Sequence, residues 1–339
     1  MKILFCSVPY SPSVGGIETV SALLAEQFHR HGHEVTLVTQ TPGTSVDPEP
    51  YVVVRNPDAA RLWALVLATD LVFHNNISLR MAWPLLVLRK PWVVAHHMWI
   101  PRHGAGRIKR AVLRWATNIA VSRAMAADLP TASQVLPNPY RDDLFRLMAG
   151  VSRERDIVFL GRLVSDKGVT ILLDALDLLA RSGLRPQLTL VGDGPERDAL
   201  QAQVRRQGLA EQVHFAGRRS GEALASLLNG HRLIVVPSTW EEPFGLVALE
   251  GLACGCVPVV ARSGGLPEVI GPCGLVFEKG SATSLARVLK ELLQSPARRQ
   301  GLLAMAPDHL ARHRPQAVAS AYIRILTDAC QPRRAALAA

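Results

Sequence analysis

The chain has 339 residues, of which 48% are hydrophobic and 19% charged, which excludes a disordered protein and favours two cored domains. The formal net charge of +10 predicts an anionic partner: nucleic acid, an acidic membrane or a phosphorylated substrate. The five cysteines form no CxxC pair, so neither a disulfide framework nor a metal site is predicted. No apolar run reaches membrane-spanning length and the N-terminus lacks a secretory apolar segment, so we expect a cytoplasmic protein.

In the first half of the chain, short apolar runs alternate with helix-length segments. Strands are predicted at residues 2–8, 33–39, 51–54, 71–73, 91–95, 118–121 and 134–136. This alternation indicates a parallel sheet covered on both faces. Gly15 and Gly16 follow the first strand at a predicted helix start, where backbone N–H groups could face an anion. They do not form the GxGxxG pattern, which argues against a dinucleotide cofactor.

The pattern restarts in the second half, after a stretch poor in apolar residues near 148–155. Further strands are predicted at residues 156–160, 187–191, 213–216, 233–236 and 257–260. We therefore predict one doubly wound domain at residues 1–150 and another at 151–314, with a helix at 315–330 that packs back on the first. Ligands of such sheets bind outside the carboxyl ends of the strands. The basic tail with Arg333 and Arg334 is predicted to be frayed.

Residues 237–260 predict a loop, a helix and a buried strand. Pro243 suits the first turn of the helix and Gly255 its end. Glu242 then lies just before the helix and Glu250 further along it. The free backbone donors at this helix start are those of Phe244, Gly245, Leu246 and Val247. Two carboxylates on either side of a phosphate-sized anion site suit a nucleotide sugar, although an ordinary βαβ unit with two solvated glutamates fits the spacing equally well.

Positive charge is concentrated in one segment. Between residues 71 and 127 there is no Asp or Glu, and nine Lys or Arg residues lie between 80 and 123. A helix predicted at 106–115 places Arg107, Arg110 and Arg114 on one stripe beside an apolar stripe, so it can lie on an anionic bilayer. Its apolar neighbours there would be Met98, Trp99 and Ile100. Alternatively, the apolar stripe faces the core and the basic one is solvated. The spacing of aromatic residues does not favour nucleic acid.

Six motifs occur in the order found in one known family. They include Gly15-Gly16-Ile17-Glu18, Gly161-Arg162-Leu163 followed by Lys167-Gly168, Gly192-Asp193-Gly194-Pro195, and Glu242 with Glu250. Over nearly its whole length the chain resembles the family 4 glycosyltransferases. This resemblance implies the α/β GT-B fold, two Rossmann-like doubly wound parallel-sheet domains facing a central cleft. It also implies metal-independent transfer of a sugar from a nucleotide sugar, with retention at the anomeric carbon and no bound cofactor.

The resemblance assigns roles to residues of the second domain. Arg162 and Lys167 resemble the pair that holds the donor diphosphate, where fixed cations stabilise the charge that grows as the sugar–phosphate bond breaks. Glu250 looks like the residue that binds the ribose hydroxyls, and Glu242 like the one that orients the donor sugar. The supporting backbone amides would be those of Phe244, Gly245 and Leu246. The nucleotide base is usually read near Gly217 and Arg218.

In the first domain the resemblance implies that Gly15 and Gly16 approach the diphosphate and that a histidine near the end of a strand contacts the donor sugar. His96 and His97 are both candidates. Neighbouring strand residues point to opposite faces, so only one can reach the ligand. Comparison of the motif favours His97 as catalytic, together with Glu242, Arg162 and Lys167, and leaves His96 as a structural histidine. His74, Asn75 and Asn76 could line the acceptor side.

The sequence therefore predicts a hexosyltransferase that uses a UDP- or GDP-sugar and a glycan, glycolipid or lipid-linked acceptor, in the assembly of cell-surface polysaccharide or glycolipid. We expect it in the cytoplasm, peripherally on the inner face of the membrane through segment 80–123. An epimerase or phosphorylase of the same fold, or a non-catalytic basic protein that binds membrane or nucleic acid, are the alternatives. Arg141 departs from the family pattern and could alter the hinge or the acceptor pocket.

Overall fold

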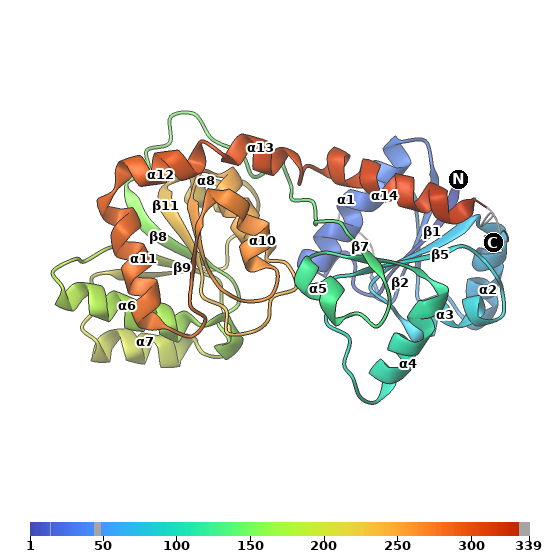
Figure 1. The fold of residues 1–339 in the computed structure, drawn as a ribbon, viewed down its shortest axis with the longest axis horizontal. Helices are drawn as coiled ribbons and strands as arrows, with labels where there is room; N and C mark the ends of the chain where they lie inside the picture. Colours follow the sequence, from blue (N-terminus) through green and yellow to red (C-terminus); the bar gives the residue numbers. More distant parts are fainter. Residues whose placement is uncertain (14, 44–48, 332–339) are drawn as a thin grey trace, which may run out of the picture. The chain divides into compact units, whose positions relative to one another are not determined.

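A computed structural model describes residues 1–13, 15–43 and 49–331. The chain forms two compact units (Figure 1): unit 1 consists of Met1–Pro139 with Pro315–Ala339, and unit 2 of Tyr140–Arg314. Unit 1 thus ends earlier than the predicted boundary at residue 150, and the C-terminal helix belongs to it. The tail with Arg333 and Arg334 lies outside the described residues.

Unit 1 contains a sheet of seven strands in the order β3-β2-β1-β4-β5-β6-β7, in which every neighbouring pair is parallel. The central strands are apolar because both of their faces are covered. Phe5 of β1, for example, is fully buried and lies edge-on to Phe73 of β4, with ring centroids 4.8 Å apart. The strands are β1 (Lys2–Ser7), β2 (Glu34–Thr39), β3 (Val52–Arg55), β4 (Leu71–Asn75), β5 (Trp92–His96), β6 (Thr117–Ala120) and β7 (Ser133–Val135).

The helices of unit 1 include the last one of the chain, which runs beside the first (Figure 1). Tyr322 of this last helix packs against Phe28 and Phe73, with ring centroids 6.4 and 5.7 Å apart. The helices are α1 (Gly16–Arg30), α2 (Ala59–Ala68), α3 (Leu79–Ala82), α4 (Ala105–Val112), α5 (Arg123–Asp128) and α14 (Pro315–Cys330), and the 3₁₀ turns are η1 (Trp83–Leu86) and η2 (Leu113–Trp115). The helix predicted at 106–115 is therefore α4 followed by η2.

Unit 2 contains six strands in the order β10-β9-β8-β11-β12-β13, again with every neighbouring pair parallel. They are β8 (Arg155–Leu160), β9 (Leu188–Val191), β10 (Val213–Gly217), β11 (His231–Val236), β12 (Val257–Ala261) and β13 (Leu275–Phe277). The predicted fold class of two doubly wound parallel α/β sheets is confirmed. Within the described residues, no helix is long and apolar enough to cross a membrane.

The helices of unit 2 cover its sheet through one large apolar core, in which α6 packs on α11. Side-chain caps fix the start of helices in both units, because the oxygens of Asp58, Ser122, Ser281 and Ser295 accept hydrogen bonds from first-turn N–H groups. The helices of unit 2 are α6 (Val169–Arg181), α7 (Arg197–Arg206), α8 (Gly221–Asn229), α9 (Leu246–Ala253), α10 (Leu266–Ile270), α11 (Ala282–Gln294), α12 (Pro296–Leu303) and α13 (Ala306–Ala311), with 3₁₀ turns η3 (Ser165–Lys167) and η4 (Gly271–Cys273).

The strand orders locate the place where each sheet binds a ligand. In a doubly wound sheet this place is the carboxyl end of the two strands at which the order reverses. In unit 1 these strands are β1 and β4, and in unit 2 they are β8 and β11. Most of the predicted site residues lie in, or close to, the loops that follow these four strands.

Candidate functional site

The loops that follow β8 and β11 are packed directly on each other. The carbonyl oxygen of Asp166, in the loop after β8, accepts hydrogen bonds from the backbone N–H groups of Thr239 (2.9 Å) and Trp240 (3.2 Å). Gly168 has a φ of +67°, and a Cβ there would overlap the carbonyl oxygen of Pro237. Only glycine permits this crossing. The two loops therefore form one support for the side chains that they carry.

Lys167 and Glu242 form an ion pair across these two loops. Lys167 Nζ lies 2.5 Å from Glu242 Oε1, and the two side chains are 23% and 14% exposed. The Ser238 hydroxyl lies 2.8 Å from the same carboxylate oxygen and 2.9 Å from the carbonyl oxygen of Asp166, so its single proton can serve only one of them at a time. The structure thus brings together two predicted catalytic residues and adds Ser238, which was not predicted.

The neighbouring Glu241 is directed to a different partner. Its carboxylate pairs with Lys279 and accepts a hydrogen bond of 2.6 Å from the Gly264 N–H, and these contacts lower the pKa of the carboxyl group. The Gly265 N–H donates to the Glu242 carbonyl oxygen at 2.7 Å. The loop after β12 therefore fixes the backbone of the two glutamates and leaves only the Glu242 side chain directed to Lys167.

Arg162 lies in the same loop as Lys167, but its side chain is exposed and makes no ion pair or hydrogen bond with another residue of the described ranges. The loop after β9 lies against its backbone, and the Leu163 N–H donates to the Asp193 carbonyl oxygen at 3.0 Å. A Cβ on Gly192 or Gly194 would overlap a carbonyl oxygen of the Arg162 loop. The glycine motif predicted at this position therefore supports the backbone that carries Arg162.

Helix α9 begins at Leu246, three residues after Pro243, which was predicted to lie in its first turn. The reason is Gly245, the residue before the helix, which has a φ of +113° and whose Cβ would overlap the Leu266 side chain. No backbone acceptor within the described residues pairs with the amide N–H groups of Phe244, Gly245 or Leu246. A helix N-terminus with such amides favours an anion.

Glu250 lies in the second turn of α9, where burial raises the pKa of its carboxyl group to about 7 and the positive charge of Arg141 acts in the opposite direction. Burial raises the pKa of the Cys254 thiol, one turn further along α9, and the Glu250 carboxylate adds to this effect. The protonated form of Glu250 is therefore favoured relative to an exposed glutamate. A ligand that donates hydrogen bonds to the carboxylate would favour its ionised form.

Replacing Glu250 by Gln is expected to change how stability depends on pH. The folded carboxyl, with a pKa of about 7, keeps its proton where the unfolded one, with a pKa of 4.5, has lost it. Relative to Glu250→Gln, the wild-type chain should therefore lose unfolding free energy as pH rises from about 4.5 to about 7, and no more above that. Urea unfolding of both chains across this range measures the difference. If the unfolding free energies of the two chains change with pH in the same way, the raised pKa of Glu250 is contradicted.

Gly217 and Arg218 follow β10. The Gly192 N–H donates to the Gly217 carbonyl oxygen at 2.9 Å, so Gly217 lies beside the glycine motif of the loop after β9. It has a φ of +68°. The Arg218 side chain is exposed. The predicted base-reading position is thus at the carboxyl edge of the unit 2 sheet, and its role stays a prediction.

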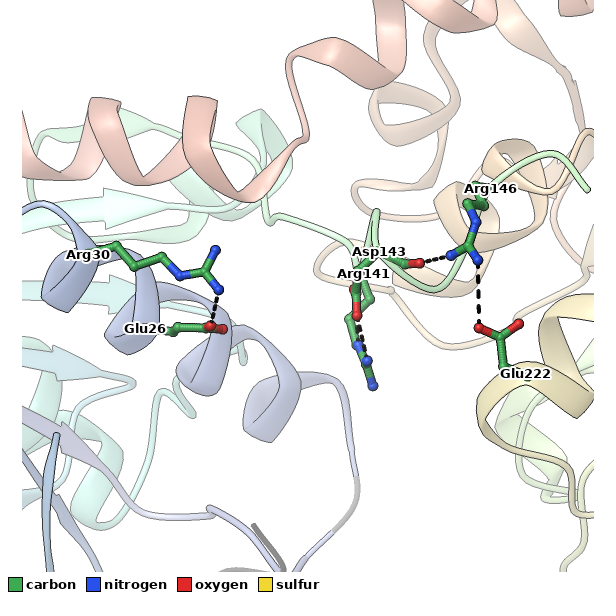
Figure 2. Close-up of polar contacts among 6 residues, drawn as sticks. All are labelled: Glu26, Arg30, Arg141, Asp143, Arg146 and Glu222. Atoms are coloured by element: carbon green, nitrogen blue, oxygen red, sulfur yellow. Dashed lines mark hydrogen bonds and ion pairs between the residues drawn. The ribbon is translucent and has the colours of Figure 1, made fainter. Parts of the chain in front are cut away.

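The segment that enters unit 2 contains Arg141. Its guanidinium donates to Asp143 at 2.7 Å, and Arg146 reaches Glu222 at 3.9 Å and the Asp143 carbonyl oxygen (Figure 2). The same view shows a surface ion pair on α1 between Glu26 and Arg30, which lie one helical turn apart. The expected influence of Arg141 on a hinge or acceptor pocket stays a prediction. Its positive charge opposes the rise that burial causes in the pKa of Glu250.

In unit 1, Gly15 is the residue before α1 and Gly16 is its first residue. Three hydroxyl and amide groups attach this helix start to the sheet. Asn75 Nδ2 at the end of β4 donates to Ser21 Oγ at 2.7 Å, and Ser21 Oγ lies 2.8 Å from Ser7 Oγ at the end of β1. β1 and β4, the strands at which the order of the sheet reverses, therefore both hold α1 in place, and with it Gly15 and Gly16.

The two histidine candidates differ in their surroundings. His96 ends β5, and its Nε2 lies 3.0 Å from Asn118 Oδ1, as a structural histidine requires. His97 is 6% exposed, and neither ring nitrogen makes a well-aligned hydrogen bond within the described residues. Burial lowers the pKa of His97 to about 3, His96 adds to this effect, and the adjoining Asn138 side chain opposes it. His97 is therefore a neutral imidazole that still has hydrogen-bonding capacity for a ligand.

Asn76 holds the backbone that carries His97. Its Oδ1 accepts hydrogen bonds from the backbone N–H groups of His97 (2.7 Å) and Met98 (3.2 Å), and its own N–H donates to the Ala95 carbonyl oxygen at 2.8 Å. Asn76 has a φ of +71°, which is uncommon for a residue other than glycine. Its Nδ2 is buried without a partner in the described residues. Such strain at a strand end is typical of functional sites.

The basic segment differs from its prediction at two residues, Arg110 and Ile100. Arg110 is not on a solvated stripe, because it pairs with Asp128 at 2.8 Å, as Arg102 also does. Ile100 is 6% exposed in the core and cannot enter a membrane, whereas Met98 is 58% exposed. The positions of Arg110 and Ile100 could not be predicted, because contacts between side chains far apart in the chain leave no periodic signal in the sequence. Contact of the segment with a membrane stays a prediction.

The architecture and the loop-borne site define a protein of the GT-B glycosyltransferase class. The structure of Anabaena Alr3699/HepE in complex with UDP and glucose superposes with a TM-score of 0.80 at 22% identity, covering 97% of this chain and 100% of that one. The structure of WaaG, a glycosyltransferase involved in lipopolysaccharide biosynthesis, superposes with a TM-score of 0.71 at 18% identity, covering 96% and 99%. These likenesses establish the GT-B fold.

Two family models match the chain, one in each half. The model described as Glycosyltransferase Family 4 matches residues 14–141, and the model described as Glycosyl transferases group 1 matches residues 148–306. The chain belongs to the family 4 glycosyltransferases, as the sequence motifs predicted.

Curated relatives match over a shorter length. D-inositol 3-phosphate glycosyltransferase from Rhodococcus opacus is 33% identical over 190 residues, which is 53% of this chain and 42% of that protein. Glycogen synthase from Mycobacterium tuberculosis is 34% identical over 147 residues, or 43% and 35%. In these matches the chain covers less than half the length of either relative.

Proposed function

We propose that the protein is a retaining glycosyltransferase that moves a sugar from a nucleotide-diphosphate sugar, UDP- or GDP-linked, to a hydroxyl of a glycan, glycolipid or lipid-linked acceptor. The observation that carries this proposal is the Lys167–Glu242 pair with Ser238, next to the unpaired amides at the start of α9. A cation, a carboxylate and free N–H groups supply what a phosphate joined to a polyhydroxyl sugar needs. The complex of Alr3699/HepE with UDP-glucose supports a donor of this class.

In this proposal Arg162, Lys167 and the α9 amides bind the diphosphate, Glu242 orients the donor sugar, and Glu250 binds the ribose hydroxyls. Arg162 has no carboxylate partner in the described residues, so its charge is available to the ligand. For unit 1 we assign Gly15 and Gly16 to the diphosphate and His97 to the donor sugar. His97 is suited to this role because it is neutral and lacks a well-aligned partner.

The transfer proceeds by front-face attack. The bond from the anomeric carbon to the diphosphate oxygen breaks, the acceptor oxygen bonds to the same face of that carbon, and the acceptor proton passes to the departing diphosphate. Arg162, Lys167 and the helix amides stabilise the charge that develops on the leaving group. A double displacement through Glu242 would instead form a covalent sugar–enzyme ester, which mass spectrometry of a quenched reaction detects.

Thermal shift against UDP, GDP, ADP and TDP tests nucleotide binding first, because a ligand that binds the folded state raises the melting temperature. We expect one uridine or guanosine diphosphate to raise it, and Arg162→Ala and Glu250→Ala to remove the shift. Proton NMR of the product should then show the anomeric configuration of the donor. Activity that persists in excess EDTA agrees with metal-independent transfer, and activity lost to EDTA contradicts it.

The same experiments separate the alternatives. An epimerase converts the nucleotide sugar without an acceptor, and a phosphorylase releases a sugar phosphate only when inorganic phosphate is present. A non-catalytic basic protein binds anionic vesicles but gives no nucleotide-dependent shift. Each outcome would replace the glycosyltransferase proposal.

We also propose a cytoplasmic location with peripheral attachment to the inner face of the membrane, through segment 80–123. Its support is the excess of positive charge in that segment, which has no Asp or Glu. A role in polysaccharide or glycolipid assembly follows from the acceptor class proposed above.

A further inference from the structure

A cavity of about 960 Å³ opens in unit 1 at the amino ends of β5 and β6. It begins where these strands start, at Trp92 and Thr117, whereas His97 and Asn76 follow the carboxyl ends of β5 and β4. The cavity is therefore separate from the predicted transfer site. Its volume is that of a ligand pocket. Its other walls are the chain before β5, η2, β7 and the end of α14.

Three cations and one carboxylate line this cavity: Arg89, Lys90 and Arg114 against Asp328. Lys90 Nζ donates to the carbonyl oxygens of Leu67 (3.0 Å) and Thr69 (2.7 Å), so it faces no carboxylate. Arg89 and Arg114 are exposed and form no ion pair among the described residues. Arg102 and Arg110 of the same basic segment instead share the carboxylate of Asp128. The cavity thus gathers three of the nine cations of the segment, and Asp328 is the one carboxylate among its lining residues.

Apolar side chains surround the cations. Leu86 and Trp115 line the cavity while remaining 54% and 57% exposed, and Val87 beside them is 69% exposed. The Arg114 guanidinium lies over the Trp115 ring, 4.7 Å from its centroid. An anionic lipid bilayer is negatively charged at its surface and apolar below it. Cations in a cavity with exposed aliphatic and aromatic groups at its rim are complementary to such a surface.

We infer that this cavity binds the phosphate headgroup of an anionic phospholipid, with Arg89 and Arg114 at the phosphate and with Leu86 and Trp115 at the acyl boundary. The occupant is a lipid of a bilayer, because a soluble phosphate would not contact the exposed apolar rim. This inference rests on the proposed membrane location, but not on the transfer chemistry. It places the attachment at the amino ends of β5 and β6 instead of on α4.

Sedimentation with vesicles tests the inference on the full chain. Wild-type protein should bind vesicles of phosphatidylcholine with phosphatidylglycerol and not vesicles of phosphatidylcholine alone. The double variant Arg89→Glu/Arg114→Glu should bind at least tenfold more weakly, because each basic residue near an anionic surface contributes measurably to binding. Leu86→Ser/Trp115→Ser should weaken binding and make the remainder more sensitive to salt.

The matched control is Arg107→Glu/Ile108→Ser, which changes one cation and one exposed apolar residue on α4. It should bind like the wild type. The inference is overturned if the α4 variant loses binding and the cavity variant keeps it, if phosphatidylcholine alone suffices, or if a chain ending at Gln331 loses binding as strongly as the cavity variant. It is also overturned if inorganic phosphate or glycerol phosphate stabilises the protein through Arg89 and Arg114 while vesicles do not bind.

Nucleotide-dependent thermal shift is measured on the same variants. The cavity variants should keep the wild-type shift, because the altered residues lie at the opposite ends of the strands from the predicted transfer site. A wild-type chain that binds vesicles but no nucleotide would contradict the proposed function and leave this inference standing. A wild-type chain that binds nucleotide but no vesicles would contradict this inference and leave the proposed function standing.

Discussion

Glu242→Gln is expected to lower kcat about 10²–10³-fold while the affinity for the nucleoside diphosphate stays within a few fold of the wild type. The change removes the negative charge that holds Lys167 Nζ at 2.5 Å and that, in the proposed function, orients the donor sugar. Loss of one preorganised group of this kind typically slows an enzyme by that factor. Initial rates over a range of donor concentration, with calorimetry of nucleotide binding, separate the two effects.

The chain contains a matched control for this experiment. Asp156 and Arg232 form an ion pair of 2.5 Å that joins the same two strands, β8 and β11, at their amino ends. Asp156→Asn removes a carboxylate of similar exposure, since its side chain is 18% exposed and that of Glu242 14%. It should cost stability comparable to Glu242→Gln and leave kcat unchanged. Equal losses of kcat would show that Glu242 acts only through the fold.

Asn76→Gly is expected to lower kcat about 10²-fold. Glycine accepts a φ of +71° without strain, so the change leaves the backbone conformation accessible and removes only the hydrogen bonds to the His97 and Met98 N–H groups. A misplacement of about 1 Å at a reacting centre produces an effect of this size. Asn76→Asp keeps the accepting oxygen and should retain more activity than Asn76→Gly. His97→Ala, measured alongside, gives the loss expected when the side chain itself is absent.

Asn56→Gly is the control for Asn76→Gly. Asn56 also follows a strand of unit 1 and has a φ of +46°. Its backbone N–H donates to the carbonyl oxygen of Thr39, on the neighbouring strand, at 2.8 Å. It is exposed, and three strands of the sheet lie between β3, which it follows, and β5. Its replacement should leave kcat unchanged. If both glycine variants, or neither, slow transfer, Asn76 does not position His97.

Much of the fold could be predicted because parallel strands covered on both faces appear in the sequence as short apolar runs. Leu233 to Val236, for example, forms most of β11. Glycines that allow close approach were also informative: Gly168, Gly192 and Gly245 lie where loops cross or where a helix begins. These signals are local, since each depends on a few neighbouring residues.

The contacts that complete the site could not be predicted, because they join distant parts of the chain. Lys167 and Glu242 are separated by 75 positions, and nothing in their spacing indicates an ion pair. One feature of the sequence could have indicated Ser238: it follows β11, one of the two strands at which the order of the unit 2 sheet reverses. The start of α9 was misplaced because Pro243 is typical of a first helical turn, whereas the positive φ of Gly245 delays the helix to Leu246.

The pairing of Lys167 with Glu242 gives the protein a means of rejecting simple anions. An inorganic phosphate or pyrophosphate that drew Lys167 away would leave the Glu242 carboxylate, 14% exposed, without its main partner, and stranding a poorly solvated charge is unfavourable. A sugar diphosphate can satisfy both partners at once, since its phosphates accept from Lys167 and its hydroxyls donate to Glu242. The resting ion pair would therefore keep the site selective in the presence of free phosphate.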